Sequence, residues 1–238
     1  MNLLYFILAA LLIFSSTLIC FEKKSIWNTI ISSIGIAGVV NANFFHFGNY
    51  PIDIFGMQFG IDSIIYTFFV FTIVLNFLYF GKKSAITYTI SGASAVFLAG
   101  AIGVIAKAFH EGHSVEAWLE FGTFAVSAIA TIAAGVTMIF CIDLLKKRTK
   151  INEMLVVIIG ILIATFINSS IYYSIEPLLK NYKFDWIPIL TSLLGKFIAL
   201  LAACFAFGFM KLIERKIKIK ELEKQKQEWE RVIGSKYE

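Results

Sequence analysis

Apolar residues along the chain gather in seven long runs, separated by short polar segments. Each run has the roughly 20 residues that an α-helix needs to cross the hydrocarbon of a bilayer. None shows the one-sided apolar stripe that is typical of a helix on the surface of a soluble protein. The runs cover residues 3–21, 26–46, 60–80, 85–107, 118–143, 152–174 and 186–213. We therefore predict an all-α integral membrane protein, a bundle of about seven transmembrane helices.

The composition also indicates that most of the chain is surrounded by the hydrocarbon of a lipid bilayer. Hydrophobic residues make up 58% of the 238 residues, charged residues make up 16%, and the mean hydropathy is +0.79. That leaves too few polar side chains to cover a soluble core. The three cysteines lie inside apolar runs without metal-ligand spacing, so we expect neither a disulfide framework nor a metal site. The first run lacks a basic leader and a small-residue cleavage site, so we interpret it as a retained helix.

The basic residues divide the predicted loops into two sets. Lys and Arg occupy the first, third and fifth loops at Lys23, Lys24, Lys82, Lys83, Lys146, Lys147, Arg148 and Lys150, and the tail from Lys211 onward. The second and fourth loops have none, and the sixth has only Lys180 and Lys183. By the positive-inside rule, the odd loops and the tail face the cytoplasm and the N-terminus faces outward. We expect a multi-pass protein of a bacterial inner membrane, and the net charge of +5 then gives no reason to expect nucleic-acid binding.

Residues 214–238 are predicted to form a basic, cytoplasmic, helical tail that continues the seventh helix. Glu214 and Lys218 are spaced for an i,i+4 ion pair on such a helix. Leu222 and Trp229 are one heptad apart. This spacing leaves three alternatives open: a short coiled coil between copies in a homo-oligomer, contact with anionic lipid, or a solvated charged helix.

One ionisable residue stands deep inside a predicted span. Lys196 is ten residues into the last run from Trp186, which is roughly 15 Å at 1.5 Å per residue. A charge at that depth costs at least about 2.5 kcal/mol and marks a functional-site hypothesis. Ser192 shares its helix face. No Asp or Glu lies deep in any run, so we expect the site to favour a neutral or anionic ligand.

The preceding run carries a polar stripe that can face this lysine. Thr165, Asn168, Ser169 and Tyr172 recur at helical spacing, and a short loop makes the last two spans antiparallel neighbours. We predict an outward-opening polar cavity between them, with a purely structural hydrogen-bond network as the alternative.

Two further amides and two aromatic residues extend the candidate site. Asn43 lies near the outer end of the second run and Asn76 in the inner half of the third, although each could simply bond a neighbouring helix. Tyr172 or Phe45 could stack on a flat ligand. The candidate substrate-binding residues are Lys196, Asn168, Ser192, Asn43, Tyr172 and Asn76.

From the second run onward, roughly residues 26–216, the chain resembles the vitamin-uptake transporters, also described as queuosine precursor transporters. The segment Asn76-Phe-Leu-Tyr-Phe-Gly81-Lys-Lys-Ser-Ala85 is similar to the family's turn between two helices. Asn168-Ser-Ser resembles the polar motif of its penultimate helix, and Ser192–Arg215 resembles its final helix with Lys196 on a family lysine. Asn76 and Ser192 stand where the family is expected to have aspartates.

The resemblance implies a six-helix transporter-like domain over residues 26–213, with residues 1–25 forming an additional N-terminal helix. It also implies a carrier that imports a 7-deazaguanine-type base, without any cofactor of its own.

Two other functions fit the sequence. The chain could be a substrate-binding membrane subunit that needs a separate ATPase, because it contains no nucleotide-binding motif. It could also be a membrane scaffold or sensor that acts through its basic tail. We do not expect an enzyme, because no catalytic constellation is recognisable.

Overall fold

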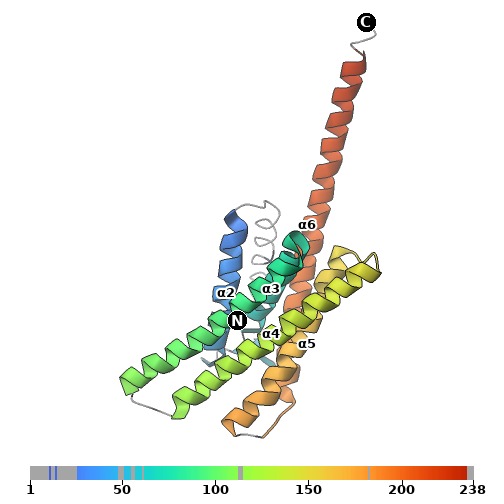
Figure 1. Cartoon of the computed structure of the whole chain (residues 1–238). Helices are drawn as coiled ribbons and strands as arrows, with labels where there is room; N and C mark the ends of the chain where they lie inside the picture. Colours follow the sequence, from blue (N-terminus) through green and yellow to red (C-terminus); the bar gives the residue numbers. More distant parts are fainter. Residues whose placement is uncertain are drawn as a thin grey trace.

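The computed structural model describes residues 11, 14, 26–47, 51–54, 57–60, 62–111, 115–181 and 183–234. Five helices make up most of this part of the chain (Figure 1). They are α2 (Ile26–Phe47), α3 (Asp62–Glu111), α4 (Val115–Arg148), α5 (Glu153–Lys180) and α6 (Ile187–Gly234). Of the described residues, those in α3, α4, α5 and α6 form four helices that are long and apolar enough to cross a membrane.

The 50-residue α3 is a helical hairpin, because it turns back on itself at Gly81. Gly81 has φ 84° and ψ 179°, a region that essentially only glycine occupies. The rings of Phe69 and Tyr88 lie 5.2 Å apart, whereas 19 residues of straight helix would separate them by roughly 28 Å. Across the turn, Ser84 Oγ donates a hydrogen bond to Asn76 Oδ1 at 3.1 Å. The runs predicted at 60–80 and 85–107 are therefore two antiparallel legs of this one element.

The first leg of α3 occupies the centre of the bundle. Almost every side chain from Ser63 to Phe77 is buried, including Phe69, Phe71 and Leu75 at 0% exposure. Helix α3 contacts α2, α4, α5 and α6. This explains why the leg is apolar all round, as a fully enclosed helix must be.

Helix α6 buries several alanines, and the side chains that it exposes within the bundle are mostly large and apolar. Its buried residues include Ala199, Ala203 and Ala206, whereas Leu201 and Phe205 are 54% and 70% exposed. In water such a surface would promote aggregation. In a membrane the arrangement is expected, since small residues let backbones approach and lipid solvates the outer face.

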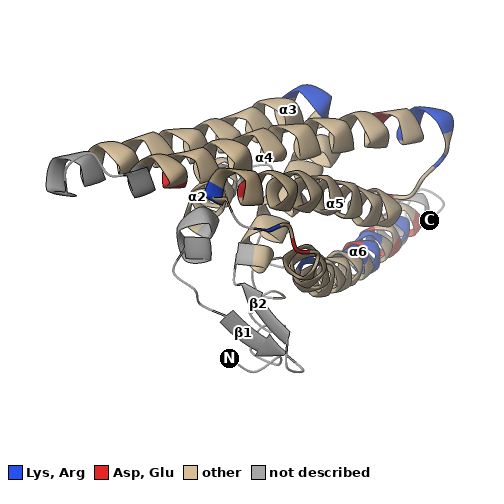
Figure 2. Ribbon diagram, turned by 90° about the horizontal axis from the view of Figure 1, so that it is seen from below, with Lys and Arg blue, Asp and Glu red and all other residues tan. Residues whose placement is uncertain are grey.

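Among the described residues, the ion pairs that join two helices lie at one end of the bundle. Asp143 near the end of α4 pairs with Lys82 just past the α3 turn, at 3.0 Å, and with Lys147 at 3.1 Å. At the start of α5, Glu153 pairs with Lys211 of α6 at 3.0 Å. Figure 2 shows basic residues at the turn of α3, at the end of α4 and along α6.

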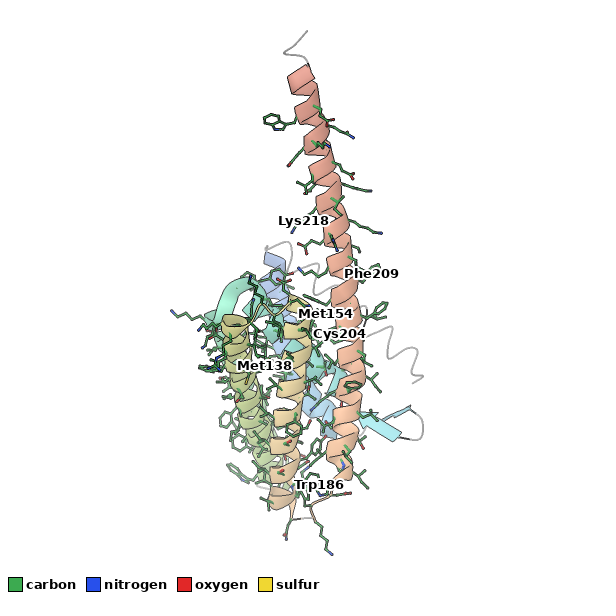
Figure 3. All side chains as sticks on the ribbon, turned by 90° about the vertical axis from the view of Figure 1, so that its right-hand side faces the viewer. Met138, Met154, Trp186, Cys204, Phe209 and Lys218 are labelled. Atoms are coloured by element: carbon green, nitrogen blue, oxygen red, sulfur yellow. The ribbon has the colours of Figure 1, made fainter. Side chains whose placement is uncertain are left out.

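Beyond that end α6 continues alone. Figure 3 shows it beside α5 from Trp186 up to Cys204 and Met154, and then projecting past Phe209 to Lys218 and further. Described side chains from Arg215 onward are exposed. Helix α6 is continuous up to Gly234, so the tail is helical as far as that residue, and its cytoplasmic position stays a prediction.

One segment differs from the prediction. The sequence predicted an all-α fold, but the structure has an antiparallel hairpin of β1 (Pro51–Ile54) and β2 (Met57–Gly60) between α2 and α3. Pro51 is opposite Gly60 and Ile54 is opposite Met57. Each strand has only four residues, which is too short for an alternating pattern to be recognised.

The helices also run past the edges of the apolar runs, α4 to Arg148 and α5 to Lys180. The backbone of both helices therefore stays helical through the polar residues that follow the apolar runs. The first predicted span, 3–21, lies outside the described residues apart from 11 and 14, so the count of seven stays a prediction.

Candidate functional site

Helices α5 and α6 face each other through a buried polar cluster, defined here as Lys196, Asn168, Ser169 and Ser192. Lys196 Nζ donates hydrogen bonds to Ser169 Oγ at 2.8 Å and to Asn168 Oδ1 at 3.3 Å. The hydroxyls of Ser169 and Ser192 lie 3.4 Å apart. Each side chain is at most 7% exposed. The four side chains therefore form one connected polar group inside an apolar bundle.

A third element completes the surroundings of the lysine. Lys196 Nζ lies 4.6 Å from the centre of the Tyr66 ring, on the first leg of α3. A cation over an aromatic face gains about 2 kcal/mol when both are desolvated. Amide oxygen, hydroxyl and ring together offset part of the cost of removing an ammonium from water.

The polar cluster lies near the middle of the apolar part of α6. Lys196 is nine residues from Ile187 and fifteen from Lys211, or roughly 14 Å and 22 Å along the helix. Asn168 is at a similar depth on α5, near the middle of the helix between Glu153 and Lys180. An ionisable group at that depth costs about 2.5–3.5 kcal/mol on insertion scales, which is why such residues are rarely kept without a function.

A groove opens beside the polar cluster, between α5 and α6. It has a volume of about 450 Å³, within the range of small-molecule sites. Its polar lining residues are Thr165 and Lys196. The apolar lining residues are Leu162, Phe166, Leu193, Leu194, Phe197 and Leu200. Phe166 is 63% exposed and Phe197 is 45% exposed, so the groove opens on the outer face of the bundle.

Thr165 is an unusual lining residue. Its side chain is 5% exposed, and its hydroxyl has no hydrogen-bond partner among the described residues. It lies three and four residues before Asn168 and Ser169, on the same face of α5. A buried hydroxyl without a partner costs about 1–3 kcal/mol, so this position calls for an explanation.

The structure brings together three of the six predicted substrate-binding residues: Lys196, Asn168 and Ser192. Tyr172 is one turn beyond Asn168 but packs with Tyr173, with the two ring centres 5.1 Å apart. The side chains of Asn43 and Phe45 lie outside the described residues.

Asn76 lies away from the polar cluster, near the turn of α3. Its Nδ2 donates to the Thr72 carbonyl at 2.9 Å and to Ser32 Oγ of α2 at 3.5 Å, and its Oδ1 accepts from Ser84. Ten residues, roughly 15 Å of helix, separate it from Tyr66. These contacts agree with the alternative that Asn76 simply bonds neighbouring helices, because its amide joins α2 to both legs of α3.

Tyr66 was missed by the sequence reasoning. It stands in a run of apolar and aromatic residues, and its position beside Lys196 depends on the packing of α3 against α6. A tyrosine in such a run gives no signal of its own.

The polar cluster offers binding chemistry. Its ammonium, hydroxyls and amide donate and accept hydrogen bonds at the border of an apolar groove, a combination that orients small ligands. Among the described residues, no group of three or more His, Cys, Asp or Glu side chains is placed to hold a metal ion. Comparison with family models, curated proteins and solved structures found no match to this chain.

Proposed function

We propose that this protein is a membrane transporter that imports a small polar metabolite, and that Lys196 is its central binding residue. The observation that carries the proposal is the burial of this lysine at mid-depth, against Asn168 and Ser169 and beside a groove. A lysine that served only to join two helices could be replaced at lower cost by a serine or an asparagine.

The proposed topology has seven spans, with the N-terminus outside and the α6 tail in the cytoplasm. Support comes from the pairing of Lys82 with Asp143 and of Lys211 with Glu153, because these contacts collect basic segments at one end of the bundle. By the positive-inside rule that end is cytoplasmic. Trp118 and Trp186, at the start of α4 and before α6, fit the opposite interface.

For the substrate we propose a 7-deazaguanine-type base, by the resemblance of residues 26–216 to the queuosine precursor transporters. The contacts are compatible with such a heterocycle. The amide of Asn168 has both donor and acceptor atoms for a base edge, and the Lys196 ammonium suits an electron-rich ring atom or carbonyl.

The test is uptake of labelled deazaguanine precursors by cells that can neither make nor import them. The wild-type chain should restore uptake, and Lys196→Ala should abolish it while the protein stays in the membrane. Lys216→Ala is the matched control, since Lys216 is an exposed lysine on the same helix. Full uptake by Lys196→Ala and by Asn168→Ala would remove the site assignment. Failure of the wild-type protein, shown to be in the membrane, would reject the deazaguanine substrate.

A further inference from the structure

The projecting half of α6, from Lys211 onward, stands apart from the other helices (Figure 1). Every described side chain from Arg215 to Glu230 is exposed. Helices in proteins owe most of their stability to the packing of an apolar face and not to intrinsic helix propensity. A long helix that stands alone in water therefore gains stability from a further partner.

Apolar residues recur along this half of α6 at heptad spacing. Leu222 comes three residues after Ile219, and Trp229 comes seven residues after Leu222. All three side chains are large and apolar, and they are 47%, 64% and 68% exposed in chain order. In a heptad, Ile219 is an a position and the other two are d positions, which together form the seam of a coiled coil. A β-branched residue at a with leucine at d favours two parallel strands.

The same side of α6 is uncovered next to the bundle. Phe205, Leu212 and Ile219 follow one another at seven-residue spacing, and the first two are 70% and 61% exposed. A straight helix drifts by only about 20° per heptad, so these three side chains leave α6 on one side. The described residues of the bundle therefore do not block a second helix that approaches along this side. Arg215, between Leu212 and Ile219, interrupts the apolar stripe near the proposed membrane surface.

Lipid does not reach the apolar residues of the projecting half. Leu222 and Trp229 are 11 and 18 residues beyond Lys211, roughly 17 Å and 27 Å along the helix. The head-group region adds only about 5–8 Å to each side of the hydrocarbon. Even at a tilt of about 40°, Trp229 would stand roughly 21 Å out. The exposed Ile213 and Ile217, which are off the stripe, are by contrast within six residues of Lys211.

A second copy of the chain has the orientation that the seam requires. Two copies with the same topology in one membrane have tails that point the same way and begin at the same level. The tails can therefore pair only in parallel and in register. A contact of this kind is isologous, because the same surface is used on both copies.

The charges beside the seam are complementary in this arrangement. In a parallel pair, a residue at g faces the e position five residues further along the partner, and such pairs set partner choice. Lys218 is at g and Glu223 is at e, and both are exposed, so a dimer contains two Lys218–Glu223 contacts between copies. Lys226 is at the next a position, and a single polar residue at a fixes register and strand number. Lys226 is paired with Glu230 of its own chain at 3.8 Å.

We propose that the projecting half of α6 is a dimerisation element. It pairs with the same segment of a second copy as a parallel, two-stranded coiled coil with Ile219, Leu222 and Trp229 in the seam. The seam is short, but insertion in one membrane confines both copies and raises their effective concentration, as a linker does. The inference rests on the membrane topology of the proposed function and not on transport of any substrate.

The first experiment measures disulfide cross-linking in native membranes, with a full-length chain that lacks its three native cysteines. Leu222→Cys puts a thiol in the seam, where the two copies face each other. Lys224→Cys is the matched control, because Lys224 is exposed at an f position on the opposite side of the helix. Under mild oxidation we expect at least about five times more cross-linked dimer from Leu222→Cys, since a disulfide needs Cβ atoms within about 4.5 Å. Equal cross-linking of the two variants, or none at position 222, would overturn the proposal.

The second experiment tests the charge pairs with two differently tagged chains that are produced in the same cells. Lys218→Glu and Glu223→Lys should each lower recovery of a chain with its own kind about fivefold, because two exposed attractive pairs become repulsive. The two variants together should recover each other as well as the wild type does, because both contacts between them are attractive again. Each chain carries the same change in both mixtures, so an altered helix does not produce this difference.

Glu221→Lys is the control for the mixed pair. It makes the same charge change as Glu223→Lys, but Glu221 is at a c position away from the seam. Lys218→Glu should therefore not recover Glu221→Lys at the wild-type level. Absence of any preference of Lys218→Glu for Glu223→Lys over itself would overturn the parallel, in-register pairing. Neither experiment involves uptake, so a failure here is distinct from a failure of the transport proposal.

Discussion

Helix α6 has two halves that share one backbone but differ in their surroundings. In the bundle half, Ile187–Phe209, the exposed side chains are large and apolar, and the single lysine is buried. In the projecting half, from Lys211 onward, the described lysines and glutamates are exposed or half-buried, and Glu214 pairs with Lys211 and Lys218. The same type of side chain is therefore inside in one half and outside in the other. This reversal indicates that the two halves meet different solvents.

The largest expected effect comes from placing the same charge on both halves. Leu201 and Leu222 are 54% and 64% exposed, so exposure alone predicts that lysine is tolerated at both positions. If lipid surrounds the first half, Leu201→Lys should cost about 2.5–3.5 kcal/mol of insertion free energy. Leu222→Lys should cost almost nothing. The amount of folded protein recovered from the membrane fraction measures both, and equal recovery would contradict the two-solvent interpretation.

A smaller effect should separate two glycines of the second leg of α3. A Cβ on Gly92 would lie 2.4 Å from Phe69 Cζ, whereas a Cβ on Gly103 would meet nothing within 4 Å. Gly92→Ala should lower stability by about 1–3 kcal/mol, because the two legs could no longer pack so closely. Gly103→Ala should raise stability by about 0.5–1 kcal/mol, because alanine favours a helix. Thermal unfolding in nanodiscs measures both, and equal shifts would show that the legs are not in close contact.

The smallest effect is expected in the projecting half. Glu214→Gln removes the carboxylate that pairs with Lys211 at 2.8 Å and with Lys218 at 2.9 Å. Because these groups are close to the surface, the loss should be about 0.2–1 kcal/mol and should shrink with added salt. A salt series of unfolding measurements tests this. A large, salt-independent loss would mean that this part of α6 is shielded from water.

The helices were predictable because hydrocarbon requires apolar runs of fixed length, and the turn at Gly81 falls where the third loop was predicted. The ends were less predictable, since α4 and α5 extend into polar residues that carry no apolar signal. The hairpin of β1 and β2 was missed because four-residue strands leave too short a pattern.

The residues of the candidate site were predictable where a polar side chain inside an apolar run is energetically costly and therefore conspicuous in the sequence. Lys196 stood out because a deep charge is expensive, and the polar stripe on α5 stood out because it repeats at helical spacing. Tyr66 did not stand out, because its place beside Lys196 depends on how three helices pack. A cavity between α5 and α6 was predicted as polar, whereas six of the eight residues that line the groove there are Leu or Phe. Asn76 lacks such a stripe in the sequence, and its contacts with Ser32 and Ser84 show that it bonds neighbouring helices.

The central claim is that α6 crosses the membrane with Lys196 inside it, and labelling of single cysteines in intact cells tests it most directly. In a chain without its three native cysteines, Lys183→Cys and Lys220→Cys would report on the two ends of α6, since both lysines are exposed. We predict that a membrane-impermeant maleimide labels position 183 in intact cells and labels position 220 only after the membrane is opened. Labelling of both positions in intact cells would contradict a membrane-spanning α6.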